Sequence, residues 1–375
     1  MIYLDYSANT PVDEAVLERF CAVERSCPGN ANSRHQAGAA AKAAIDEATQ
    51  SIARSLHVQP AEIIYTSGAS EANNFALKSI ARLERHHGKH IISTPLEHSS
   101  VSGTLTALQE QGYEIDLVDI KQDGTVDLAH LRELLRPDTI LVAVTAVDSE
   151  LGVVQPVTEI AALLKDYPHC HLHVDATQAV GKIPVSFEGV DTMSLTAHKF
   201  YGLNGIGLLL KRRNLALEPL IHGGESTTIY RSGTPTVALA SSLALALELA
   251  VVQLPEHTEA VQKANTFLRT ELAKYPKVRI NSPENAIPHI LNLSVQDVKG
   301  TVFQRELNEE GVCVSVKSAC SSDGLPSRAV FAVSRDRRNA LSSWRVSLSH
   351  RTTEEDLRGF LAAFDRCYRG LTETK

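Results

Sequence analysis

The chain has 375 residues, of which 43% are apolar and 22% are charged, and its formal net charge is -7 at pH 7. This length and apolar content allow two domains with a large core. The negative charge argues against nucleic acid or a membrane surface as the main partner, because neutralising phosphate groups needs clustered lysine and arginine. We expect the two short basic runs, 211–213 and 335–338, to be solvated loops.

The N-terminal segment and the cysteines predict a cytoplasmic protein. Acidic residues occur too early in MIYLDYSANTPVDE for the apolar core of a signal peptide. The most apolar helical window, 237–252, is shorter than the ~20 residues of a membrane span. The six cysteines include no C-x-x-C spacing, which favours free thiols in a reducing compartment.

Strand and helix patterns alternate over the first two thirds of the chain. A short extended piece, a helix capped by Asp13 and an Ala-rich helix at 37–56 come first. The alternation that follows favours a mostly parallel, seven-stranded α/β sheet covered by helices. The expected strands are 62–66, 89–94, 114–120, 139–147, 171–175, 192–196 and 205–211.

Near residue 254 the pattern becomes a mixture of helices and strands that ends in an amphipathic helix from Thr353. We expect a smaller α+β domain made of 254–375 together with 1–12, and a large domain over 13–253.

Two residues at expected strand ends form a candidate site. Lys199 follows strand 192–196, and Asp175 closes strand 171–175. Ligands of α/β sheets bind beyond the carboxyl ends of the strands. Taken alone, Lys199 would be read as an ordinary surface ammonium. Beside a strand-end carboxylate it also fits a Schiff-base lysine of pyridoxal phosphate, whose ring nitrogen needs such an acid to keep its proton.

The stretch SGASEANN follows strand 62–66, and its small residues open directly into a helix. Free N–H groups and the positive helix end could hold a phosphate there. A serine cap with Glu71 in the first turn explains the same residues equally well. His98 begins another helix just past a strand end, so we expect it at the same rim as Asp175 and Lys199.

A histidine-rich strand raises the question of a metal site. His169, Cys170, His171 and His173 lie in one expected strand, whose alternate residues share a face. That strand must also be sheet core, and the sequence shows no second ligand pair nearby. We therefore expect no metal.

Cys320 lies in SVKSACSSDGLPSRA, a polar segment with glycine and proline that is typical of a flexible loop. Apolar packing does not explain a cysteine among serine, lysine and aspartate. We interpret Cys320 as a reactive thiol, with Lys317 available to stabilise its thiolate.

Together these pieces resemble the cysteine desulfurases of the class V, fold-type I pyridoxal-phosphate aminotransferase superfamily, in the NifS/IscS-like branch with the longer active-site loop. The resemblance covers nearly the whole chain in order. The matching motifs are YLDYSANTPVD, GNANSRH, SGASEANN, EHSS, HVDATQAVG, SLTAHKFYG, RSGT, SACSS and WRVSLSHRTTEED.

The resemblance implies a role for each matching residue. Lys199 would carry the cofactor, Asp175 would pair with the pyridinium nitrogen, and His98 would stack on the ring and help move protons. Cys320 would accept the sulfur, and Arg345 would bind the substrate carboxylate. Other contacts are implied for Ala69, Ser70, Thr196 and His198 at the phosphate, Thr234 reaching it from the other subunit of a homodimer, Gln178 and Ser149 near the ring oxygen, and Asn30 at the substrate.

The implied activity converts L-cysteine to L-alanine and leaves a persulfide on Cys320 for an acceptor protein in iron–sulfur cluster assembly, tRNA thiolation or thio-cofactor synthesis. Alternatives are another class V reaction, such as transamination or a cysteine or selenocysteine lyase, and a catalytically weakened scaffold for sulfur-transfer partners. The chain departs from the family pattern at Ser149, Glu225, Ser226, Lys317 and His350–Arg351. These departures bear on rate, partner and substrate preference.

Overall fold

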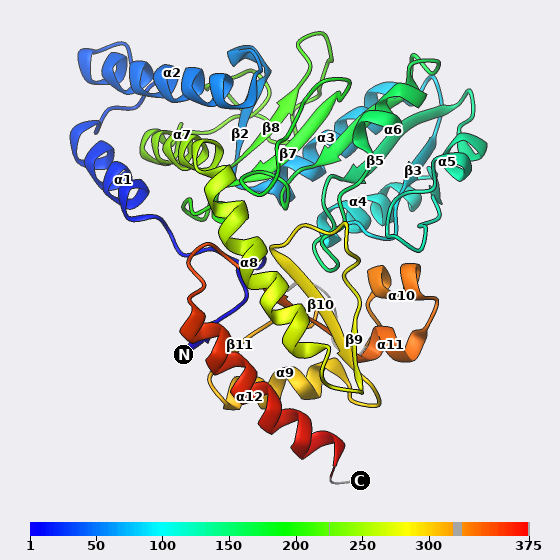
Figure 1. Cartoon of the computed structure of the whole chain (residues 1–375). Helices are drawn as coiled ribbons and strands as arrows, with labels where there is room; N and C mark the ends of the chain where they lie inside the picture. The colour runs from blue at the N-terminus through cyan, green and yellow to red at the C-terminus, as the bar shows by residue number, and fades with distance from the viewer. Residues whose placement is uncertain (225, 318–324, 374–375) are drawn as a thin grey trace.

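Figure 1 shows the computed structural model, which describes every residue except 225, 318–324 and 374–375. A central seven-stranded sheet has the strand order β2-β8-β7-β6-β5-β3-β4, and β8 runs antiparallel to both of its neighbours. The other pairings are parallel, which confirms the mostly parallel sheet predicted from the sequence. The strands are β2 (Ile63–Thr66), β3 (His90–Ser93), β4 (Glu114–Leu117), β5 (Thr139–Thr145), β6 (His171–Asp175), β7 (Thr192–Thr196) and β8 (Gly207–Lys211).

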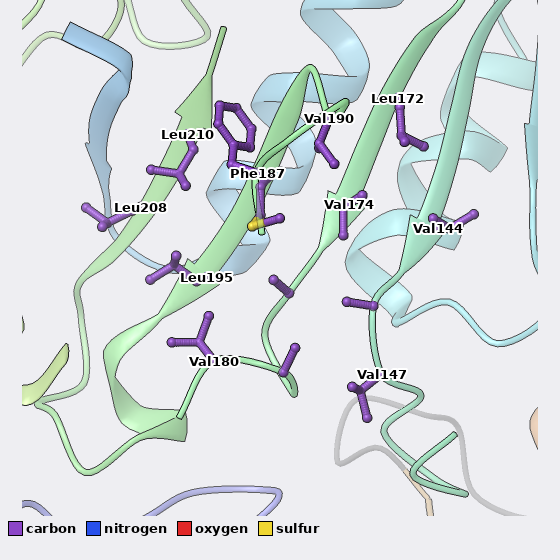
Figure 2. Close-up of a cluster of buried hydrophobic side chains, with 14 of the residues drawn as sticks. Val144, Val147, Leu172, Val174, Val180, Phe187, Val190, Leu195, Leu208 and Leu210 are labelled. Carbon is purple, nitrogen blue, oxygen red and sulfur yellow. The ribbon is translucent and has the colours of Figure 1, made fainter. Parts of the chain in front are cut away.

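Both faces of this sheet are covered, so nearly every residue of the central strands β5, β6, β7 and β8 is buried, polar residues included. α3 (Ala69–Glu84) and α4 (Ser99–Gln109) pack their apolar side chains on one face. The opposite face carries α5 (Leu128–Leu134), α6 (Val157–Leu164) and α7 (Val237–Val252). Figure 2 shows side chains from neighbouring strands meeting in that second layer, among them Val144, Leu172, Val174, Leu195 and Leu210.

The C-terminal part has its own small sheet and core. β10 (Ile290–Val295) lies between β9 (Val278–Ile280) and β12 (Ser343–Ser347), with both pairings antiparallel. β1 (Ile2–Tyr3) pairs with β11 (Val312–Cys313), so the start of the chain lies beside its C-terminal part. The core of this part includes Leu4, Leu268, Phe303, Trp344 and Phe360. Its long helices are α8 (Leu254–Leu272), α9 (Gly300–Glu309) and α12 (Glu354–Thr372). The division into domains at the boundaries given above stays a prediction.

Three predicted helices begin within one residue of the position that the sequence indicated. Asp13 caps α1 (Glu14–Ser26), because its carboxylate accepts a hydrogen bond from the N–H of Ala15. The Ala-rich helix is α2 (Gln36–Leu56). Thr353 and Asp356 form a reciprocal capping box at the start of α12.

The expectation that both basic runs are solvated loops is wrong for Lys211, whereas residues 335–338 are all exposed, as expected, although 337 and 338 belong to a helix. Lys211 is buried in β8, where its Nζ donates to the carbonyl oxygen of Leu215 at 2.7 Å. In the second run the chain passes from α10 (Arg328–Ser334) into α11 (Arg337–Ser342), and the carboxylate of Asp336 caps α11. At Lys211, buried carbonyl acceptors therefore outweigh the tendency of a basic run to remain solvated.

Within the described ranges, no single helix is long and apolar enough to cross a membrane. α7 and α8, bent by 66° at their junction, satisfy the test of length and composition only when taken as a pair.

Candidate active site

A cavity of about 340 Å³ opens at the carboxyl ends of the central strands. Residues from the start of α3, the ends of β5, β6 and β7, the N-terminal segment and β12 line it. This arrangement brings together most of the residues that the sequence singled out. They are Lys199, Asp175, His98, Gln178, Ala69, Ser70, Thr196, His198, Ser149 and Arg345.

Lys199 ends a short 3-10 turn, η2 (Ala197–Lys199), that directly follows β7. Its Nζ donates hydrogen bonds to the carbonyl oxygens of Ser7 and Ala8, both at 2.7 Å. The N-terminal segment therefore holds the amine at the cavity. Burial, followed by the positive charges of Lys199 and Lys182, lowers the pKa of His198 to about 4, so this ring is neutral near pH 7.

Asp175 is buried at the end of β6 and is held by two donors. Its Oδ2 accepts from Asn73 Nδ2 at 2.8 Å, and its Oδ1 accepts from the N–H of Thr177 at 2.9 Å. The Oδ1 of Asn73 accepts from the hydroxyl of Ser194 at 2.5 Å and from Nε2 of His173 at 2.9 Å. One α3 amide thus joins α3 to β6 and β7 and fixes the carboxylate in place.

His98 is the N-cap of α4. Its Nδ1 accepts from the N–H of Ser100 at 3.1 Å and lies 2.9 Å from the Ser100 hydroxyl, which in turn accepts from Asn73 Nδ2. Because Nδ1 is an acceptor, the proton of the neutral ring is on Nε2. Burial lowers the pKa of His98; the charge of Asp175 opposes this effect, and that of Lys199 adds to it.

The first turn of α3 lies at the cavity, and its backbone N–H groups have no partner within the helix. Its N-cap is Gly68, with φ at 155°, and no side chain among the described residues accepts a hydrogen bond at this cap. Glu71 accepts from the N–H of Ser67 at 2.7 Å and pairs with Arg231 at 3.0 Å. The start of α3 therefore suits an anion, since its N–H groups and its dipole both favour negative charge.

Arg345 is 2% exposed, and its guanidinium lies at the cavity wall. Nη2 pairs with the carboxylate of Asp5 at 3.0 Å, and Nη1 donates to the carbonyl oxygen of Ser149 at 2.6 Å. Its Nε is buried with no hydrogen-bond partner among the described residues. The position suits an anionic ligand, which would share the guanidinium with Asp5.

These features fit pyridoxal phosphate. Lys199 offers an amine, Asp175 a fixed carboxylate, and the start of α3 an anion site. The hydroxyl of Thr177, at the cavity beside Asp175, is buried and has no hydrogen-bond partner within the described part of the chain. An unsatisfied buried hydroxyl is expected where a polar ligand group completes the site.

Three predicted residues are not placed at this cavity. Thr234 is exposed and lies at a different hollow, with Ser226 and Arg231. Asn30 is exposed, and its Oδ1 accepts from the N–H of Asn32 at 2.9 Å. Cys320 falls outside the described residues.

The sequence analysis missed two residues that organise the cavity wall. Asn73 stands in SGASEANN, but its link to Asp175 joins positions 102 residues apart. Lys182 is buried four residues after Gln178, and its Nζ donates to Gln178 Oε1 at 2.9 Å. Burial, followed by the charges of Lys199 and Arg345, lowers the pKa of Lys182 to about 7. Sequence reasoning could have found Lys182 from its position four residues after Gln178.

A cavity at the strand ends of the sheet, lined by a lysine and by a fixed carboxylate, is a feature of pyridoxal-phosphate enzymes. The chain belongs to the aminotransferase class-V family, whose model matches residues 2–360.

More closely, the chain is similar to one curated protein and two solved structures. It is 37% identical over 370 residues to "Cysteine desulfurase IscS" of Dictyoglomus turgidum, covering 97% of this chain and 94% of that protein. A solved structure named "NIFS-like protein" superposes with a TM-score of 0.93 at 34% identity, over 99% of this chain and 100% of the other. A structure described as "SspA in complex with cysteine" superposes with a TM-score of 0.83 at 30% identity, covering 94% and 100%.

Proposed function

We propose that this protein is a cysteine desulfurase, which uses pyridoxal phosphate to remove sulfur from L-cysteine and yields L-alanine and a persulfide on Cys320. The main support for the proposal is that Lys199, Asp175 and His98 line one cavity beside the start of α3. The cysteine desulfurase relative and the cysteine-bound SspA structure support the choice of substrate.

We assign the cofactor contacts to residues that line this cavity. Lys199 would carry it, and Asp175 would pair with its ring nitrogen. Ala69 and Ser70, with Thr196 and His198, would hold its phosphate. Gln178 uses one Nε2 hydrogen for the carbonyl oxygen of Ser7, which leaves the other for the ring oxygen. The bound cofactor would supply an electron sink for the bond electrons at the substrate Cα.

Each of the chain's own reactive groups then has a separate role in the reaction. Arg345 binds the cysteine carboxylate and orients Cα toward Lys199. The amine of Lys199, helped by neutral His98, removes and later returns the Cα proton. The Cys320 thiolate attacks the substrate sulfur. An S–S bond forms as the Cβ–S bond breaks, and the electron pair left on Cβ takes up a proton to give alanine.

The test uses purified protein loaded with pyridoxal phosphate, supplied with L-cysteine and a thiol reductant. We expect sulfide and alanine in equal amounts. Cys320→Ser should lose sulfide release by at least about a hundredfold while keeping the visible absorbance of the bound cofactor, and Lys199→Ala should lose both. Full turnover in Cys320→Ser would favour another class V reaction instead, and a protein that never binds the cofactor would overturn the proposal.

We also propose a homodimer in the cytoplasm that passes persulfide sulfur to an acceptor protein. Thr234 of each subunit would reach the phosphate in the other subunit's cavity. Three large apolar side chains in the segment before Thr234 are exposed in the single chain: Leu220 at 38%, Ile221 at 40% and Ile229 at 67%. Exposed apolar side chains of this kind support an interface there.

A further inference from the structure

A cluster of histidine and carboxylate side chains lies at the opposite edge of the sheet from the cavity. Glu84 is the last residue of α3, His87 follows in the next turn, and His169 comes just before β6. Asp175 marks the cavity end of β6, so His171 at the other end lies about 13 Å away along the strand. The cluster is therefore separate from the proposed catalytic residues.

The contacts in this cluster bring three metal-binding groups together. Nδ1 of His87 lies 2.7 Å from Oε2 of Glu84, and the rings of His87 and His169 stack with centroids 3.7 Å apart. One ligand atom from each of Glu84, His87 and His169 lies within 4.8 Å of the other two. Ligand atoms around a tetrahedral zinc ion are about 3.3 Å apart, given bonds of about 2.0–2.1 Å. Small rotations of the exposed His87 and His169 would close the difference.

A second layer of residues fixes the carboxylate. Nε2 of His171 lies 3.5 Å from Oε1 of Glu84, and its Nδ1 lies 3.6 Å from Oδ1 of Asp191. Asp191 is itself fixed, because its Oδ2 accepts from the N–H of Leu172 at 2.8 Å. Such outer contacts orient ligands and are typical of metal sites.

We propose that Glu84, His87 and His169 bind one Zn²⁺ ion, with water in the fourth position. Two imidazoles and one carboxylate suit zinc better than magnesium or calcium, which prefer oxygen ligands alone. The ion would tie the end of α3 to the start of β6. The expectation of no metal rested on the lack of a second ligand pair near the histidine-rich strand, and the end of α3 and the turn after it supply that pair in space.

The test measures zinc binding directly, by equilibrium dialysis of cofactor-loaded protein against ZnCl₂ followed by elemental analysis. A Cys320→Ser background removes the thiol that we interpret as reactive, so that it does not bind zinc in its place. We expect His87→Ala and His169→Ala each to weaken binding at least about tenfold, and the double variant to lose this site. Zinc should also raise the unfolding temperature of the Cys320→Ser protein and leave that of the double variant unchanged.

His86→Ala is the matched control. His86 is exposed and its ring lies 3.9 Å from that of His87, but it is not one of the three ligands, so zinc affinity should stay within about twofold. Equal loss in His86→Ala would overturn the ligand assignment. Unchanged binding in the double variant, or anomalous diffraction from zinc-soaked crystals that places the ion only elsewhere, would overturn the site.

Discussion

At the scale of the residue, Asn73 connects more of the candidate site than any group that the sequence singled out. Its side chain bonds to Asp175, Ser100, His173 and Ser194. Through Ser100 it also reaches His98. The carboxylate proposed for the cofactor nitrogen and the imidazole proposed to move protons therefore depend on one amide.

Asn73→Ala should destabilise the protein by about 1–3 kcal/mol, because it leaves buried polar partners unsatisfied. It should also weaken pyridoxal phosphate binding, since Asp175 loses one of its two donors. Calorimetric unfolding and titration with the cofactor measure the two effects. The matched control is Asn74→Ala, whose amide donates to the carbonyl oxygen of Ser70 at 2.9 Å and to no other group among the described residues, and it should change stability by less than about 0.5 kcal/mol. Equal effects in the two variants would refute the role given to Asn73.

At the scale of the element, α3 presents a different chemistry at each end. Its first turn, after Gly68, opens on the cavity, while Glu84 at its last turn joins the histidine cluster. Between the two ends it packs on the sheet through apolar side chains such as Phe75 and Ile80. A rigid helix seated in this way holds both sites at fixed positions relative to the sheet.

Gly68→Ala tests the cofactor end of α3. With φ 155° and ψ 177°, Gly68 occupies a region that is essentially restricted to glycine, so alanine should cost about 1–3 kcal/mol and loosen the phosphate site. Gly103→Ala is the control: Gly103 lies inside α4 with nothing within 4 Å of an added Cβ, and alanine there should stabilise by about 0.5–1 kcal/mol. Unfolding and cofactor titration of both variants distinguish local strain from a general effect of replacing glycine. Unaltered cofactor affinity in Gly68→Ala would contradict the proposed anion site.

At the scale of the whole molecule, distant parts of the chain complete the cavity. Ser7 and Ala8 bind Lys199, and Asp5 pairs with Arg345 of β12. The N-terminal segment is therefore a structural part of the site, and the proposed dimer would add Thr234 from outside the chain.

Ile229→Glu should shift the protein toward monomer, because it places a charge in the proposed interface where 67% of the Ile229 side chain is exposed in the single chain. Turnover should fall along with dimer content, since Thr234 then no longer reaches its neighbour's phosphate. Val252→Glu changes a side chain that is 72% exposed at the end of α7 and should leave the dimer intact. Sedimentation velocity measures the dimer content of the two variants. A wild-type monomer with full activity would contradict the proposed dimer.

Features that depend on local pattern were predictable from the sequence. Strands interleaved with helices predicted the parallel sheet, because parallel neighbours need a long crossover connection, which is usually a helix. Asp175 and Lys199 were found because strand ends of such a sheet meet at one edge. Capping residues such as Asp13 and Thr353 act over a few neighbours and can be read directly.

Only the tertiary structure decided how distant side chains share buried space. The network around Asn73, the pairing of Asp5 with Arg345, and the approach of Glu84 and His87 to His169 join parts of the chain that no periodic pattern relates. Burial likewise placed Lys211 inside the sheet, although its basic neighbours predicted a solvated loop. The sequence by itself determined where the strands lie, in which order the candidate functional residues follow one another along the chain, and which family the chain resembles. The packing of α3 on the sheet determined which of those groups touch, because hydrogen bonds and ion pairs depend on positions in space rather than on spacing in the chain.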